Sequence, residues 1–218
     1  MKRINIGEVT AGKLLGLLKD LKDKMSGKDP IISWSGLMRF INLSKDQQKL
    51  FEQGRNPFVH QTFKVWKTIK IGTGLSTAEG FTDAIHKLGA KVSDWANDIM
   101  KQKAFTVAKE ETEINLVKVT VKELGFKEGA TYEDICNRAK ELGLELCPAE
   151  VAPQLRLQYT DQPKGEWLRI AMEPIVGSGG YSNVFEVAHD DDDLWLNWNV
   201  GTSDYFWHSD NCFVFCLV

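Results

Sequence analysis

GGYSNVFEVAHDDDDLWLNWNVGTSDYFWHSDNC, residues 179–212, is the stretch that says most about the fold of this 218-residue chain. Strand-like runs at 184–187 and 194–200 flank the acidic run 190–193, which predicts a hairpin with a solvent-exposed turn. Large aromatic residues stand among Ser, Asn, Asp and Gly, and the stretch has no Lys, Gln or Met and one Glu. Rigid aromatics among small polar residues are typical of antibody-like contact surfaces, because they supply contact area at low entropy cost.

The aromatic residues of this stretch have two interpretations. In the first, they fill the core of a small sheet domain, which we expect for Trp195 and Trp207. In the second, residues flanked by Gly, Ser and Asp lie on exposed loops, which we expect for Tyr181, Tyr205 and His208.

Working outward, the C-terminal half reads mainly as strands. A β-rich segment at 114–121 is followed by a helix that Thr131 caps and Gly143 closes. The rest consists of strand-like runs separated by Gly, Asp, Ser and Asn turns, at 144–147, 155–159, 166–173, 184–187, 194–200 and 213–217. This order predicts an α+β domain at residues 111–218 with small, mostly antiparallel sheets.

The first 110 residues read mainly as short helices. Helices are expected at 14–21, from Ser44 to about Phe51, from Ser76 to Gly89 and after Ser93. Capping boxes, in which a Ser precedes a Gln or Glu by three residues, mark the second and third of these starts. The segment 63–71 fits a helix or a strand. We therefore expect a mainly helical N-terminal region, 1–110, before the sheet domain.

Charge divides the chain at the same place. Residues 1–110 have 19 Lys or Arg and 11 Asp or Glu, whereas residues 111–218 have 8 and 19, so the formal net charges are +8 and −11. An acidic surface repels phosphates, so we expect no nucleic-acid site in the C-terminal domain. In the basic part, dispersed Lys residues on solvated helix faces are the favoured interpretation, and a nucleic-acid or acidic-partner surface stays open.

Hydrophobicity and cysteine usage indicate the compartment. No run of 18 apolar residues occurs, and Met1–Asn5 lacks the apolar stretch of a secretion signal. We therefore expect no membrane segment and, by default, a cytoplasmic protein. The four cysteines are too few for a disulfide framework in a chain of this length and read as free, mostly buried thiols: Cys136, Cys147, Cys212 and Cys216.

Three short motifs could hold a ligand, and each has a simpler explanation. Gly72-Thr73-Gly74 lacks the third glycine of a dinucleotide-binding turn. The spacing of His208, Cys212 and Cys216 suits zinc on an extended strand, but no Cys-x-x-Cys pair is present. The acidic run 190–193 lacks the spacing of an EF-hand loop. We expect no metal and no cofactor.

Several segments share a pattern with one known family: ELGF (123–126), CPAEV (147–151), PQLRLQY (153–159), QPKGEW (162–167), LWLN (194–197) and FVF (213–215). They resemble the variable proteins of diversity-generating retroelements, with the archaeal branch the nearest, over roughly residues 60–218. The resemblance implies a C-type-lectin-like domain at 111–218 and a segment 179–212 that the retroelement diversifies. It also implies binding of protein or cell-surface ligands without known catalysis.

Adenine-directed mutagenesis, the mechanism of such retroelements, gives a test of composition. From an AAC codon it can produce Tyr, Ser, Asp, His, Cys, Val, Thr and Gly, but never Lys, Glu, Gln, Met or Trp. The stretch 179–212 nearly obeys this, with Glu186 and three Trp residues as fixed exceptions. The expected ligand-binding residues are mutable ones together with the fixed Trp198: Tyr181, Ser182, Asn183, Val200, Thr202, Tyr205, His208, Ser209 and Cys212.

Two features limit what the resemblance implies. Glu173-Pro174-Ile175 and Trp198-Asn199-Val200 each lack the last ligand of the calcium motifs of sugar-binding C-type lectins, so calcium-dependent sugar binding is not expected. The same broad fold includes formylglycine-generating oxidases that use a cysteine pair. Cys212 with Cys216 therefore keeps such an oxidase as the alternative function.

Overall fold

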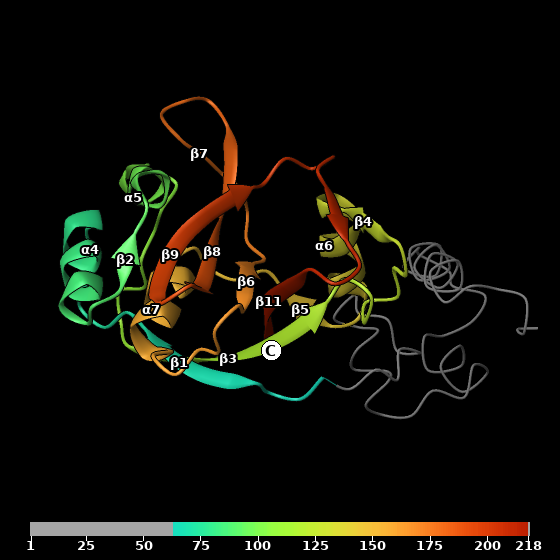
Figure 1. Ribbon diagram of the computed structural model, residues 1–218, viewed down its shortest axis with the longest axis horizontal. Helices are drawn as coiled ribbons and strands as arrows, with labels where there is room; N and C mark the ends of the chain where they lie inside the picture. Colours follow the sequence, from blue (N-terminus) through green and yellow to red (C-terminus); the bar gives the residue numbers. More distant parts are fainter. Residues whose placement is uncertain (1–62, 218) are drawn as a thin grey trace, which may run out of the picture. The chain divides into compact units, whose positions relative to one another are not determined.

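The computed structural model describes residues 63–217, and all of these but 141–143 belong to one compact unit. The unit is built mainly of strands (Figure 1): β1 (Lys67–Ile71), β2 (Lys91–Val92), β3 (Thr112–Thr120), β4 (Gly129–Thr131), β5 (Leu144–Glu145), β6 (Trp167–Ile170), β7 (Ile175–Val176), β8 (Ser182–Asp190), β9 (Asp193–Val200), β10 (Phe206–His208) and β11 (Cys212–Leu217).

Nine of these strands form one curled, mixed sheet. The order is β1-β3-β11-β6-β8-β9-β2, and β5 lies beside β11 and β7 beside β8. Strand β11 pairs in parallel with β6, as β2 does with β9, and the other neighbours are antiparallel. Strands β4 and β10 form a separate antiparallel ribbon. Several of the pairings that build the sheet therefore join segments that are far apart in the sequence.

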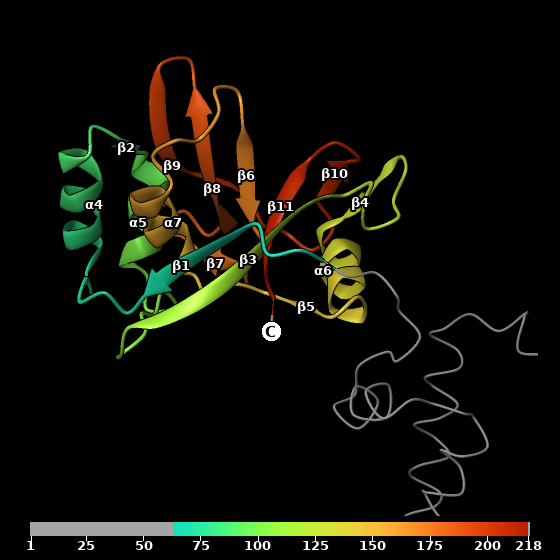
Figure 2. The ribbon, with the colours of Figure 1, turned by 90° about the horizontal axis from the view of Figure 1, so that it is seen from below.

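Four short helices among the described residues pack around this sheet: α4 (Ala78–Lys87), α5 (Asp94–Lys101), α6 (Tyr132–Glu141) and α7 (Val151–Gln158). Both ribbon views show α4 and α5 near β2 at one end of the unit, and α6 near β4 at the other (Figure 2). The helices thus lie on both sides of residue 110 in the sequence.

Capping residues fix where the helices begin. The Ser93 and Thr131 side chains accept a backbone N–H three residues later at 3.2 Å in each case, as expected at the starts of α5 and α6. Helix α4 is capped by Thr77 and not by Ser76, because the Thr77 hydroxyl is the one that accepts the backbone N–H of Gly80. Gly89 ends this helix with a φ of 77°, which is the left-handed stop expected from the sequence.

Aromatic side chains join the helices to the sheet. Phe105 meets Phe81 of α4 edge-on, with ring centroids 5.9 Å apart, and meets Phe185 of β8 at 6.1 Å. Phe81 and Phe185 are fully buried. Each such side chain stabilises the fold by roughly 1.5–3 kcal/mol relative to exposure.

A buried arginine fixes α7 against β8. The guanidinium of Arg156 donates to the Gln162 side chain at 2.6 Å, to the Ala188 carbonyl at 3.3 Å, and to the Tyr159 carbonyl. Burial lowers the pKa of Arg156 to about 10, which still leaves the group charged at neutral pH. The backbone carbonyls therefore replace the water that this charge would otherwise bind.

The expected fold class is wrong. We expected an α+β chain in which a C-type-lectin-like domain of small antiparallel sheets follows a mainly helical region at 1–110. The described residues instead form a mostly β unit around one nine-stranded mixed sheet. Strand β1 and strand β2 both lie before residue 110, and β1 pairs with β3 beyond it. Helical periodicity in short segments could not reveal these long-range pairings.

One expected strand is a helix. The run 155–159 alternates apolar and polar residues, which suggested a strand, but 151–158 forms α7. Val151, Ala152 and Leu155 are fully buried, and their spacing of three to four residues places them on one helical face. The helical periodicity depends on Val151 and Ala152, which lie before the run 155–159.

Some expectations concern other parts of the chain. The helices expected at 14–21 and from Ser44 to about Phe51 lie outside the described residues.

No helix between residues 63 and 217 has the length and hydropathy that crossing a bilayer requires.

Candidate functional site

The segment 202–206, here called the exposed loop, follows β9 and ends with Phe206, the first residue of β10, and all its residues are exposed. Its backbone is nevertheless tied to the start of α6. The Tyr132 backbone N–H donates to the Tyr205 carbonyl, and that of Glu133 donates to the Ser203 carbonyl, each at 3.0 Å. These bonds satisfy two N–H groups that a helix start leaves without an internal partner. A fixed backbone with free side chains suits contact with another molecule.

Trp207 supports the exposed loop from inside. Its side chain is 3% exposed, and its ring lies edge-on to those of Tyr205 and Phe213, with centroid separations of 5.0 and 5.2 Å. The Arg169 guanidinium lies over the same ring at 5.5 Å. On β10, Trp207 points inward, whereas its neighbours Phe206 and His208 are exposed, as strand alternation requires.

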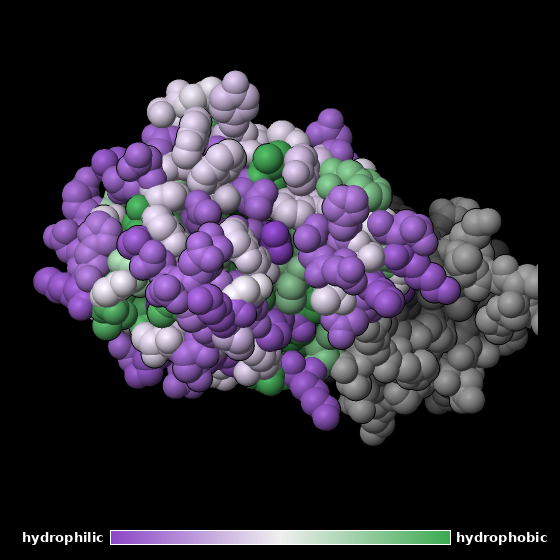
Figure 3. Space-filling view, viewed as in Figure 1, coloured by the Kyte–Doolittle hydropathy of each residue, from purple (hydrophilic) through white to green (hydrophobic). Residues whose placement is uncertain are grey.

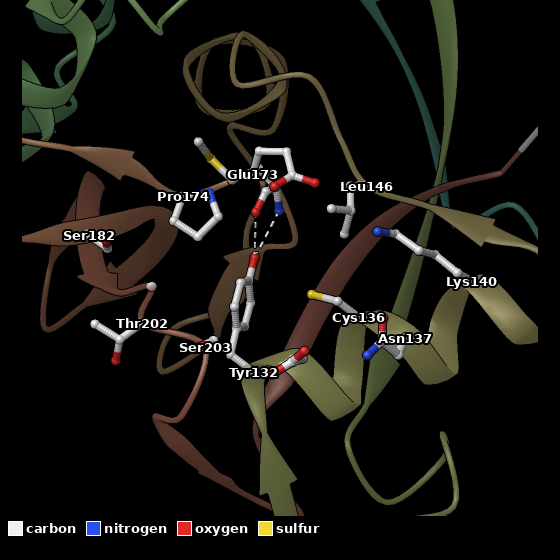
Figure 4. A pocket seen from close by; sticks show the side chains of 13 residues that line it. Tyr132, Cys136, Asn137, Lys140, Leu146, Glu173, Pro174, Ser182, Thr202 and Ser203 are labelled. Carbon is white, nitrogen blue, oxygen red and sulfur yellow. Dashed lines mark hydrogen bonds between the residues drawn. The ribbon is translucent and has the colours of Figure 1, made fainter.

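A pocket of about 550 Å³, here called the α6 pocket, opens beside the exposed loop (Figure 4). Buried side chains of Tyr132, Cys136 and Met172 contribute to its lining. The Tyr132 hydroxyl donates to the Met172 carbonyl at 2.7 Å and accepts the Met172 backbone N–H at 3.0 Å. This pair of bonds joins α6 to the segment after β6. The volume lies within the range of pockets that hold small molecules or a large side chain.

Exposed charges stand around the α6 pocket. Glu133, Lys140 and Glu173 line it, and none of the three side chains has an ion-pair or hydrogen-bond partner between residues 63 and 217. Figure 4 shows Lys140 and Glu173 extending toward the same space. Ser182 and Thr202 add hydroxyl groups that can both donate and accept. The pocket therefore combines an apolar lining with polar groups free to bind a ligand.

Two buried side chains that line the α6 pocket, Cys136 and Tyr132, have raised pKa values. Burial raises the pKa of the Cys136 thiol to about 11, and burial also raises the pKa of the Tyr132 hydroxyl. Both groups are protonated at neutral pH, and reactive thiols require the opposite shift.

A second exposed group, here called the aromatic patch, consists of Trp95, Tyr181 and Trp198. The Trp95 and Trp198 rings are 5.1 Å apart, and Tyr181 is 66% exposed. Gly179 lies between two of these rings, because a Cβ built on it would lie 3.4 Å from both the Trp95 and the Tyr181 rings. Its turn is fixed to α5 through the Ser178 N–H, which donates to Asp98 at 2.8 Å.

A further cavity of about 730 Å³ opens near the start of β11 and includes Cys212. Its charges are largely paired within the protein. Lys118 lies 2.7 Å from Glu166, and Arg169 lies 2.8 Å from Glu186. Burial raises the pKa of Cys212 to about 11, so this thiol is also protonated at neutral pH.

The expected binding residues differ in exposure. Tyr181, Thr202, Tyr205 and His208 are exposed, and the partly exposed ones are Ser182, Trp198, Val200, Ser209 and Cys212. The expectation that Asn183 contacts a ligand is corrected, because its side chain is fully buried and donates to the Tyr181 carbonyl at 2.6 Å. Asn183 can therefore support the surface but cannot contact a ligand.

The structure distributes the expected residues among neighbouring features. Ser182 and Thr202 share the α6 pocket, and Tyr205 belongs to the exposed loop that borders it. Tyr181 and Trp198 belong to the aromatic patch, and Cys212 to the further cavity.

Trp195 does not take the core position expected for it. It is partly exposed on β9, with the Lys91 ammonium 5.3 Å from its ring centroid.

The alternative based on the C-terminal cysteines loses its structural basis. Cys212 and Cys216 are four residues apart on β11, which separates their Cα atoms by about 13 Å in an extended strand. The two thiols therefore cannot act as a paired catalytic site. No group of three or more His, Cys, Asp or Glu among residues 63–217 is arranged to hold a metal ion.

Several residues of the site were not expected there from the sequence. Glu133 looked like an ordinary solvated charge and Trp95 like part of a short helix, whereas Glu173 drew attention only as part of an incomplete calcium motif. They reach the site only because α6 contacts the segment at Met172 and because α5 packs against β9.

Replacing Tyr205 or Tyr181 with Ser is expected to change the free energy of unfolding by no more than about 1 kcal/mol, because both side chains are surface residues, at 40% and 66% exposure. Urea unfolding monitored by circular dichroism would measure the change. A loss of about 3 kcal/mol or more, which is the usual cost of truncating a buried aromatic side chain, would show that these rings are structural.

The surface over β7, β8 and β9 has intermediate hydropathy (Figure 3), as expected from the mixture of aromatic and small polar residues in segment 179–212. On the face seen in Figure 3, the part above β7, β8 and β9 is pale, the colour of intermediate hydropathy, whereas purple hydrophilic residues dominate near α4 and α6.

Comparison of the chain with protein-family models, curated proteins and solved structures finds no significant match.

Proposed function

We propose that this chain is a binding protein that holds a protein or cell-surface ligand on the exposed loop and in the α6 pocket beside it. One observation carries the proposal. The side chains of residues 202–206 are all exposed, while their backbone is bonded to the start of α6. Such a loop can contact a partner with little loss of backbone entropy, because it is already ordered.

The chemistry of the two features suits protein recognition. The exposed loop offers Tyr205 and Phe206, and aromatic residues are enriched where protein partners meet. The α6 pocket offers a place where one partner side chain could be buried, with Glu133 and Glu173, which have no ion-pair partner among residues 63–217, at its edge. A partner with basic residues would also match the −11 net charge of residues 111–218.

We further propose that a retroelement diversifies this surface, as the resemblance to variable proteins implies. The proposal does not use the fold expected from that resemblance. Exposed side chains such as Tyr181 and Thr202 make few internal contacts, so the fold tolerates many replacements at their positions. Asn183 and Trp207 are buried, so replacements there would damage the support of the surface.

The neighbouring DNA tests diversification directly. We expect a reverse-transcriptase gene and a near-copy of the 3′ coding segment that differs at adenines. Sequencing the gene from many cells should show substitutions concentrated at codons 181, 182, 202 and 205 and absent from codon 207. Substitutions scattered equally over buried and exposed codons, with no reverse-transcriptase gene nearby, would contradict the proposal.

Binding itself can be tested by display. A library randomised at residues 202–205 should yield binders to a defined protein target such as hen egg lysozyme. A matched library randomised at 190–193, the exposed turn between β8 and β9, should yield none or far fewer. Equal yields from the two libraries would show that the exposed loop has no special suitability for binding.

A further inference from the structure

Two cysteines that are far apart in the sequence touch inside the protein. The sulfur atoms of Cys147 and Cys216 are 3.3 Å apart. Cys216 lies on β11, and Cys147 follows β5, the short strand that pairs with β11. Both residues are buried, at 4% and 6% exposure. Cys136 and Cys212 make no such contact within the part of the chain that the structure describes.

We propose that Cys147 and Cys216 are a site of reversible oxidation, at which a small disulfide such as oxidised glutathione converts the two thiols into one internal disulfide. The inference is independent of the proposed binding function. It rests on the contact between the two sulfur atoms and on the backbone around them.

The backbone already holds the two residues near each other. A disulfide has a sulfur–sulfur distance of about 2.05 Å, so the two atoms must approach by about 1.3 Å. Rotation about the Cα–Cβ bonds can supply a movement of this size. The Cys147 N–H donates to Ala171 at 2.7 Å, and Ala171 in turn donates to Val214 of β11 at 3.0 Å, so this segment stays next to the strand that carries Cys216.

The reaction balances in two exchange steps. One thiol loses its proton and attacks a sulfur of oxidised glutathione, which forms a mixed disulfide and releases one glutathione thiolate. The second thiol loses its proton and attacks the protein sulfur of this mixed disulfide, which releases the second glutathione. The protein loses two hydrogen atoms and two electrons, and one molecule of oxidised glutathione becomes two of reduced glutathione.

Access requires a local opening, and β5 is suited to it. This strand has two residues, Leu144 and Glu145, and short strands with few hydrogen bonds open at low free-energy cost. Burial, with Cys216 as neighbour, raises the pKa of the Cys147 thiol. Since the thiolate is the reactive form, oxidation should be slow at neutral pH and faster in alkaline solution.

The disulfide would stabilise the fold around the α6 pocket. It closes a loop with 68 residues between positions 147 and 216 and so restricts the unfolded chain. Leu146, next to Cys147, lines the α6 pocket, so the bond would also fix that wall. We expect the melting temperature of the oxidised protein to rise by roughly 5–15 °C.

The test uses the full chain incubated with oxidised glutathione at about pH 7 and about pH 8.5, followed by mass spectrometry and non-reducing peptide mapping. We expect a product two hydrogens lighter, a Cys147–Cys216 cross-linked peptide, faster formation at the higher pH, and reversal by dithiothreitol. Cys147→Ser and Cys216→Ser should each abolish the cross-link, whereas the control variants Cys136→Ser and Cys212→Ser should keep it.

Two results would overturn the proposal. One is a fully reduced wild-type protein after prolonged incubation at the higher pH, and the other is a cross-link that uses Cys136 or Cys212 instead. Mapping of the wild-type chain decides both, so the conclusion stands even where a serine variant fails to fold.

Discussion

Replacing Trp207 with Ala is expected to lower the free energy of unfolding by about 3–5 kcal/mol, the usual cost of truncating a buried aromatic residue. The Trp207 ring is 3% exposed and contacts Tyr205, Phe213 and Arg169. Its removal leaves a cavity between the β10 ribbon and the sheet. The exposed loop would lose its support at the same time, so we expect ligand binding to weaken even where the protein still folds.

Trp95→Ala is the matched control, because Trp95 is the same residue type at 40% exposure. Its loss should cost about 1 kcal/mol, since much of the ring already contacts water. Urea unfolding of both variants and the wild type gives the comparison. If Trp207→Ala cost no more than Trp95→Ala, Trp207 would not support the loop, and the proposed surface would lose its foundation.

The expectations that held depend on local chemistry. The acidic run forms the turn between β8 and β9, and Asp191 takes the left-handed conformation there with a φ of 48°. Asp tolerates this conformation better than most residues. Thr131 and Ser93 cap helices because their hydroxyl groups reach N–H groups only three residues away. A few consecutive residues determine each of these features, so the sequence alone predicts them.

The expectations that failed depend on distant contacts. The parallel pairing of β11 with β6 and of β9 with β2 joins segments that no local pattern connects. For the same reason the sequence indicated small antiparallel sheets and not one mixed sheet. Asn183 is polar and follows exposed residues in the sequence, yet it is buried because β8 is an inner strand whose residues 183–188 are all buried.

In the candidate site, too, the exposed residues could be predicted from local sequence, whereas the pocket formed by distant contacts could not. Sequence composition drew attention to Thr202 and Tyr205, which are exposed. The α6 pocket was missed, since it exists only where the Tyr132 hydroxyl binds the backbone of Met172, 40 residues away. A residue's type predicts its chemistry, but a pocket is a property of the tertiary arrangement.

The second large effect is expected at Arg169, which makes an ion pair with Glu186 beneath the surface. The two groups are 2.8 Å apart, and the Glu186 side chain is 2% exposed. Replacing Arg169 with Met leaves a buried carboxylate without its cation. We expect a loss of about 3–5 kcal/mol at neutral pH, the usual cost of breaking a buried ion pair on one side. Asn199 still donates to Glu186 at 3.0 Å but carries no charge.

The cost of Arg169→Met should depend on pH. Burial raises the pKa of Glu186, and Arg169 partly opposes the shift, so the variant should raise the pKa further. A carboxyl whose folded-state pKa is raised contributes stability below its unfolded pKa, about 4.3, and loses it as pH rises through the folded pKa. The difference between the variant and the wild type should therefore be small near pH 4 and grow toward pH 7.

The double variant Arg169→Met, Glu186→Gln separates charge from packing. A neutral amide at position 186 removes the buried charge and can still accept a hydrogen bond from Asn199, so the double variant should regain much of the stability lost at pH 7 and lose the pH dependence. Urea unfolding at both pH values measures these differences. A cost that is equal at the two pH values would mean that Arg169 acts through its contact with the Trp207 ring, 5.5 Å away, and not through the charge of Glu186.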